Sequence, residues 1–147
     1  MAINIFLASH GMFAQEALNT AEMIIGNPQK NMAVLSVTKG KTYEESLREV
    51  QTKLADLKKQ NAETLVLVDI YGGTPGNVAT YITLTNDDVL VYSGLNIPVL
   101  LELCLSQPEN LAAAKEIIEK TYPQALVNIT EKAKEGVKQN GNQVDSY

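Results

Sequence analysis

The chain of 147 residues contains one cysteine, one histidine and no tryptophan. A lone cysteine cannot form an internal disulfide, and Cys104 lies inside the apolar run VLLELCL, which indicates a buried, unreactive thiol. One histidine and scattered carboxylates leave no recognisable spacing for metal ligands. The sequence therefore predicts no metal site and no cofactor.

Basic residues are also scarce, since 12 Lys and Arg stand against 17 Asp and Glu, which gives a net charge of −5. Binding to nucleic acid phosphates needs clustered Lys and Arg, so nucleic acid is not an expected partner. No apolar run approaches the roughly 20 residues that span a bilayer. The N-terminus also lacks a basic segment followed by an apolar one. We therefore expect a cytoplasmic protein.

What the chain has is an ordinary globular composition, with 45% hydrophobic and 20% charged residues. Its length suits one domain with one core. Residues 139–147 have no apolar period, whereas the preceding chain does. We predict a single domain over residues 1–138, followed by a flexible C-terminal tail.

Two apolar periods alternate along the chain. Short runs rich in Val, Ile and Leu, typical of strands covered on both faces, occur at 3–9, 32–37, 64–69 and 88–93. Helical patterns occur at 12–25, 43–60, 97–105 and 109–134, the last interrupted near Pro123. This alternation predicts βαβ units, and hence an α/β fold: an open three-layer sandwich with a mainly parallel four-stranded sheet.

Sheets of this kind place their sites at the carboxyl ends of the strands. His10 and Gly11 follow the first predicted strand, DIYGGTPGN (69–77) follows the third, and SGLNIP (93–98) follows the fourth. We expect these three turns to converge on one edge of the sheet.

His10 and Asp69 are the candidate catalytic residues at that edge. A lone histidine often only caps or packs against a helix, and Asp69 suits a turn cap equally well. However, an imidazole placed just before a glycine and a helix N-terminus lies where backbone amides would stabilise a phosphoryl group on its ring. A neighbouring carboxylate would fix the tautomer and leave the other ring nitrogen as a nucleophile.

The glycines of these turns are candidate phosphate-binding residues. GGTPGN lacks the Lys-Ser/Thr of a P-loop, so it is not a nucleotide motif. The backbone amides of Gly11, Gly72 and Gly73 can still approach a phosphate, with the Thr74 hydroxyl as a further donor.

Four segments together resemble the enzyme IIA component of the mannose-class phosphoenolpyruvate-dependent sugar phosphotransferase system, which includes mannose, fructose, sorbose and gluconate systems. They are SHG (9–11), AEMIIG (21–26), VDIYGGTPGN (68–77) and GLNIPVLLE (94–102). The resemblance covers nearly the whole chain. It implies that His10 is the active histidine, that Asp69 is its partner carboxylate, and that Thr74 takes the place of a family serine or threonine.

The resemblance also implies partners. His10 would accept a phosphoryl group from the carrier HPr and pass it to a histidine of enzyme IIB, which serves a membrane permease of the IIC and IID type. It implies a homodimer in which a short strand near 136–138 adds antiparallel to the partner's sheet edge. Relatives are often fused to a IIB domain, whereas we expect this chain to be free-standing. Gly76 departs from the family pattern, because relatives often carry phenylalanine there.

Two other functions fit the same residues. The first is a non-catalytic regulatory or ligand-binding α/β module in which His10 only contacts a ligand, and it predicts no covalent phosphohistidine. The second is a small hydrolase that would use Ser9 beside His10.

Overall fold

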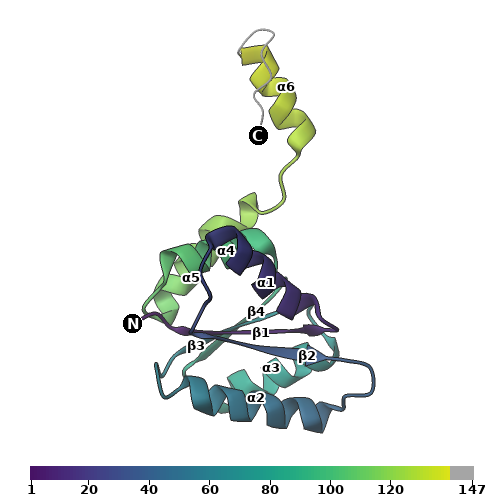
Figure 1. The fold of residues 1–147 in the computed structure, drawn as a ribbon, viewed down its shortest axis with the longest axis vertical. Helices are drawn as coiled ribbons and strands as arrows, with labels where there is room; N and C mark the ends of the chain where they lie inside the picture. The colour runs from purple at the N-terminus through teal and green to yellow at the C-terminus, as the bar shows by residue number, and fades with distance from the viewer. Residues whose placement is uncertain (140–147) are drawn as a thin grey trace.

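The computed structural model describes residues 1–139, so the predicted tail lies, from residue 140 onward, outside the described residues. The described chain forms three layers, with a sheet between two layers of helices (Figure 1). All strand pairs are parallel, in the order β2-β1-β3-β4. The strands are β1 (Asn4–His10), β2 (Met32–Val37), β3 (Thr64–Val68) and β4 (Val89–Ser93). This confirms the predicted α/β sandwich and its four parallel strands.

Strands β1 and β3 lie at the centre of the sheet. They contribute side chains to two separate cores, because successive side chains point to opposite faces of the sheet. The core on one face takes Ile5 and Leu7 from β1, and the core on the other takes Phe6 and Ala8. Each of these four residues is at most 3% exposed. Burial on both faces explains why these strands read as continuous apolar runs rather than as alternating ones.

Helices α1 (Phe13–Ile25), α4 (Ile97–Ser106) and α5 (Leu111–Thr121) cover one face, and α2 (Tyr43–Leu57) and α3 (Gly73–Thr85) cover the other (Figure 1). Local sequence sets several of the helix starts. Thr42 and Glu45 form the complete capping box of α2. The side chains of Asn96 and Asn110 accept backbone N–H groups at the starts of α4 and α5.

Helix α3 was not predicted from the sequence. Its segment, GTPGNVATYITLT, is rich in glycine, threonine and β-branched residues, which are poor helix formers. The helix nevertheless buries Val78, Ala79 and Ile82 against the sheet. Tertiary packing therefore overrides local propensity here, and it is this helix that begins beside His10.

The C-terminal region agrees with its prediction in one feature and differs in another. The helical pattern expected at 109–134, with an interruption near Pro123, is present as α5 and a separate helix, α6 (Ile129–Gln139), on either side of a 3-10 turn, η1 (Tyr122–Gln124). The strand expected near 136–138 is wrong, because those residues lie within α6. The Asn128 side chain accepts the N–H of Glu131 at 3.0 Å and starts this helix. Helix α6 has no buried residue and stands away from the rest of the chain (Figure 1).

Cys104 is buried in α4, as predicted. Burial, followed by the negative charge of Glu22, raises the pKa of its thiol to about 11. Across residues 1–139 there is no helix with both the length and the apolar character that a membrane span requires.

Candidate active site

His10 and Asp69 meet at the carboxyl ends of β1 and β3. These strands are neighbours in parallel register, with Ala8 beside Val68, and Asp69 extends the pairing when its N–H donates to the Ala8 carbonyl at 3.1 Å. The Asp69 Oδ2 atom lies 2.8 Å from His10 Nδ1 and also accepts the His10 backbone N–H at 3.0 Å. Two contacts to one carboxylate oxygen hold both the backbone and the ring of His10.

The two side chains differ in their access to solvent. The His10 side chain is 48% exposed, whereas that of Asp69 is 14% exposed. The ring can therefore be reached from solution while its partner carboxylate is shielded from competing water. This is the arrangement expected of a reacting group and the group that orients it.

Asp69 is held in its charged form. Burial on its own would raise the pKa of this carboxyl, but hydrogen bonds from the backbone and ring of His10, with the adjacent Ile70 amide, outweigh burial and lower the pKa below its usual range. A carboxylate only accepts hydrogen bonds, so Nδ1 of a neutral His10 ring must carry the proton. The lone pair then lies on Nε2, which is free to act as a nucleophile.

The glycine-rich turn supplies hydrogen-bond donors on the Nε2 side of the ring. Gly72 caps the start of α3 and Gly73 is its first residue. Any Cβ at position 73 would lie against Cε1 and Nε2 of His10, which places Nε2 at the start of this helix. Within residues 1–139 the N–H groups of Gly72, Gly73 and Thr74 donate to no protein acceptor, and the half-buried Thr74 hydroxyl makes no hydrogen bond. Such free donors at a helix start favour an anion.

Gly11 and Ser9 have other tasks. The Gly11 N–H donates to the Val37 carbonyl of β2 at 2.9 Å, so this amide is not available to a phosphate in the structure. Ser9 is fully buried, and its hydroxyl accepts the Ala14 N–H at 2.7 Å near the start of α1. Since neighbouring strand residues face opposite ways, Ser9 points away from the His10 side of the sheet. This contradicts the hydrolase alternative.

The third predicted turn reaches the site through its backbone only. The Gly94 N–H donates to the Asp69 carbonyl at 3.2 Å, and Asn96 is used as the cap of α4. The three turns therefore converge as expected, but SGLNIP supports Asp69 instead of supplying a reacting side chain.

Exposed apolar residues, which sequence reasoning did not single out, flank both members of the pair. Met12 and Phe13 follow the His10 turn, and Ile70 and Tyr71 follow Asp69. All four are more than half exposed, and Tyr71 reaches 92%. The available signal was the clustering of large apolar residues directly after two strands, at the sheet edge that holds the candidate site.

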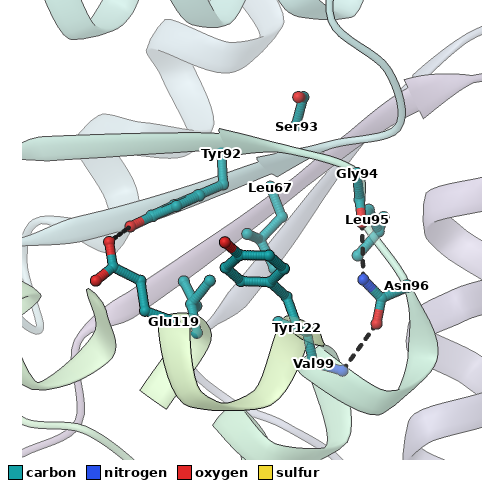
Figure 2. Close-up of a pocket in the computed structure, with 10 residues that line it drawn as sticks. Leu67, Tyr92, Ser93, Gly94, Leu95, Asn96, Val99, Glu119 and Tyr122 are labelled. Atoms are coloured by element: carbon teal, nitrogen blue, oxygen red, sulfur yellow. Dashed lines mark hydrogen bonds between the residues drawn. The ribbon is translucent and has the colours of Figure 1, made fainter. Parts of the chain in front are cut away.

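A cavity of about 410 Å³ lies beyond β4, but neither His10 nor Asp69 lines it. Figure 2 shows Tyr92 and Tyr122 facing it from β4 and η1, with the Tyr92 hydroxyl donating to Glu119 Oε1 at 3.4 Å. Burial, followed by the charge of Glu119, raises the pKa of Tyr92. This cavity is separate from the His10 site. Among residues 1–139, no three His, Cys, Asp or Glu side chains gather as metal ligands would.

A family model and a known relative each match most of this chain. Residues 4–122 match a family model, EIIA-man, described as "PTS system fructose IIA component". The chain is 30% identical over 138 residues to the "PTS system mannose-specific EIIAB component" of Escherichia coli K12. That alignment covers 94% of this chain, which spans 39% of the relative's length.

Two further similarities cover most of both chains. The "PTS system fructose-specific EIIA component" of Bacillus subtilis 168 is 32% identical over 110 residues, which are 75% of this chain and 73% of the relative. The crystal structure of a PTS IIA protein associated with the fucose utilization operon of Streptococcus pneumoniae superposes with a TM-score of 0.77 at 34% identity. It covers 90% of this chain and 98% of that one.

Proposed function

This chain belongs to the family of fructose and mannose IIA components of the sugar phosphotransferase system (PTS), and on that premise we propose that His10 carries a phosphoryl group between two partner proteins. The donor is the phosphohistidine carrier HPr and the acceptor is enzyme IIB. The single observation that carries this proposal is the 2.8 Å contact between His10 Nδ1 and Asp69 Oδ2, which leaves Nε2 as the nucleophile.

The transfer takes place in two steps, and each step breaks one P–N bond and forms another. The Nε2 lone pair of His10 attacks phosphorus in phospho-HPr, the P–N bond to HPr breaks, and its electron pair returns to the HPr ring. A histidine of enzyme IIB then attacks phosphorus in the same way, and His10 regains its lone pair. Both steps exchange one phosphohistidine for another, so positioning and charge stabilisation matter more than acid or base chemistry.

Asp69 orients the ring and balances its charge. A ring that carries a phosphoryl group on Nε2 and a proton on Nδ1 is cationic in its imidazole part. The ionised carboxylate at Nδ1 stabilises that state without ever bonding to phosphorus.

The start of α3 would bind the phosphoryl oxygens through hydrogen-bond donors. We assign the free N–H groups of Gly72, Gly73 and Thr74, with the Thr74 hydroxyl, to these oxygens. Gly11 is left out of this set, because its N–H is bonded to Val37.

The exposed apolar residues Met12, Phe13, Ile70 and Tyr71 flank this site along the chain and suit contact with protein partners. HPr and enzyme IIB would occupy this surface in turn, since each must bring a histidine to Nε2. Enzyme IIB would pass the phosphoryl group on for uptake through a IIC and IID permease, which this chain would therefore serve indirectly. This role belongs to the cytoplasm.

We also propose that the protein is a homodimer. Strand β4 is an edge of the sheet, and an uncovered edge is open to pairing with another chain. The segment after α5 leaves Tyr122, Leu126 and Ile129 more than half exposed. A partner subunit would cover both features, although α6 is helical here and provides no strand.

Incubation with phosphoenolpyruvate, enzyme I and HPr tests the phosphocarrier role. We expect one phosphoryl group per chain, in an acid-labile and alkali-stable bond, and none on His10→Ala. His10 is the only histidine, so the label has one possible imidazole. Labelling that persists in His10→Ala would refute the role. A wild-type protein that never takes the label would favour the non-catalytic binding module.

A further inference from the structure

Gly73 differs from the other glycines near the site in what its missing side chain would meet. A Cβ at Gly73 would lie 2.7 Å from both Cε1 and Nε2 of His10. Non-bonded carbon atoms rest at about 3.5–4.0 Å. The ring in its observed place and a side chain at position 73 therefore exclude each other.

Backbone conformation alone does not explain this glycine. Gly40, Gly72 and Gly73 all have φ in the left-handed region, at +90°, +103° and +74°, where residues with a Cβ are strained. A Cβ at Gly40 or Gly72 would meet nothing within 4 Å. Only Gly73 of these three combines the unusual φ with contact to His10.

The His10 ring cannot move away from Gly73 and keep its hydrogen bond to Asp69. Its Nδ1 atom is held 2.8 Å from Asp69 Oδ2, while its Cε1 and Nε2 atoms face Gly73. The imidazole is thus fixed between a carboxylate on one side and a bare Cα on the other. Movement away from Gly73 must turn the ring against the Asp69 hydrogen bond.

We propose that Gly73 is a positioning residue for His10: its lack of a side chain lets the imidazole lie against the start of α3 while Nδ1 stays on Asp69. This deepens the proposed function, and rests on it for the transfer step. A methyl group at position 73 would displace the ring, which weakens the Asp69 contact and moves Nε2 away from the amide donors.

The contact can be tested without any phosphoryl transfer. In wild-type protein we expect a nuclear Overhauser effect between His10 Hε1 and the Gly73 Hα atoms, and its absence overturns the proposal. Long-range ¹H–¹⁵N correlation of the single imidazole should show the neutral ring protonated at Nδ1. In Gly73→Ala we expect the proton to redistribute toward Nε2, because the hydrogen bond that selects Nδ1 is weakened.

Transfer from phospho-HPr supplies the second readout. A displacement of about 1 Å in reacting groups can slow a reaction about 100-fold, and we expect a loss of that order in Gly73→Ala. Gly40→Ala carries a similar backbone strain without a Cβ contact to His10, so it should transfer as wild type does. Gly72→Ala strains the same turn with no Cβ contact and should lose less than Gly73→Ala.

Equal losses in Gly40→Ala and Gly73→Ala would assign the effect to backbone strain and overturn the proposal. A wild-type tautomer and transfer rate in Gly73→Ala would overturn it as well. If wild-type protein takes no phosphoryl group, the phosphocarrier role fails. The tautomer measurement then still decides whether Gly73 positions the ring.

Discussion

Replacing Asp69 tests the central pair of the site. Asp69→Ala removes both contacts of Oδ2, the 2.8 Å bond to Nδ1 and the 3.0 Å bond to the backbone N–H of His10. Asp69→Asn keeps an oxygen that can accept both donors but removes the negative charge. Asp69→Ala therefore tests the loss of ring orientation and charge together, whereas Asp69→Asn tests the loss of charge alone.

The size of the effect follows from these contacts. A hydrogen bond to a charged group contributes about 1.5–3 kcal/mol. If that stabilisation applies to the charged ring in the transition state, its loss slows transfer roughly 10- to 150-fold. Loss of ring orientation adds up to about another 100-fold. We expect Asp69 variants to be slower by about 10- to 10⁴-fold, with Ala at least as slow as Asn.

Rapid-quench transfer from labelled phospho-HPr, in single turnover and in both directions, measures this directly. Asp88→Ala is a matched control, because Asp88 is a half-buried carboxylate that pairs with Lys58 and lies at the opposite end of the sheet. It should transfer at the wild-type rate. Wild-type rates for Asp69→Ala in both directions would show that Asp69 is only a turn cap and would refute the role of its contact with His10.

The dimer, the pKa of Asp69 and the structural role of Ser9 can each be tested in solution. Sedimentation at micromolar concentration should give a dimer, and a clean monomer would refute the proposal that a partner covers β4. The folded state lowers the pKa of Asp69, so this carboxylate stabilises the fold at neutral pH and loses that contribution as the pH falls below about 4. The free energies of unfolding of wild type and Asp69→Asn, measured in urea, should therefore converge in acid. A constant difference from about pH 7 to about pH 3 would contradict the lowered pKa. Ser9→Ala removes the acceptor of the buried Ala14 N–H and should cost about 1–2 kcal/mol in urea unfolding, while His10 is still labelled; loss of the label in a folded Ser9→Ala protein would reopen a role for Ser9.

Much of the fold was predictable because burial on both sides of a parallel sheet leaves a local signal. The apolar runs of β1 to β4 and the Thr42–Glu45 capping box are features of neighbouring residues, and the structure confirms them. Helix α3 was missed since its stability comes from packing of Val78 and Ile82 and not from its own sequence. The strand expected near 136–138 was wrong for the opposite reason, because those residues belong to a helix that local sequence starts at the Asn128 cap.

For the site, the chain's own residues show which chemistry is available: one imidazole, one carboxylate after the third strand, and glycines in the turns that follow the strands. How these groups meet depends on the pairing of the folded strands. His10 and Asp69 lie 59 residues apart, and the register of β1 against β3 brings Oδ2 to Nδ1. The contact between the His10 ring and Gly73 leaves no local signal in the sequence. A glycine that is needed for its positive φ cannot be distinguished there from a glycine that is needed to leave space for a neighbouring ring.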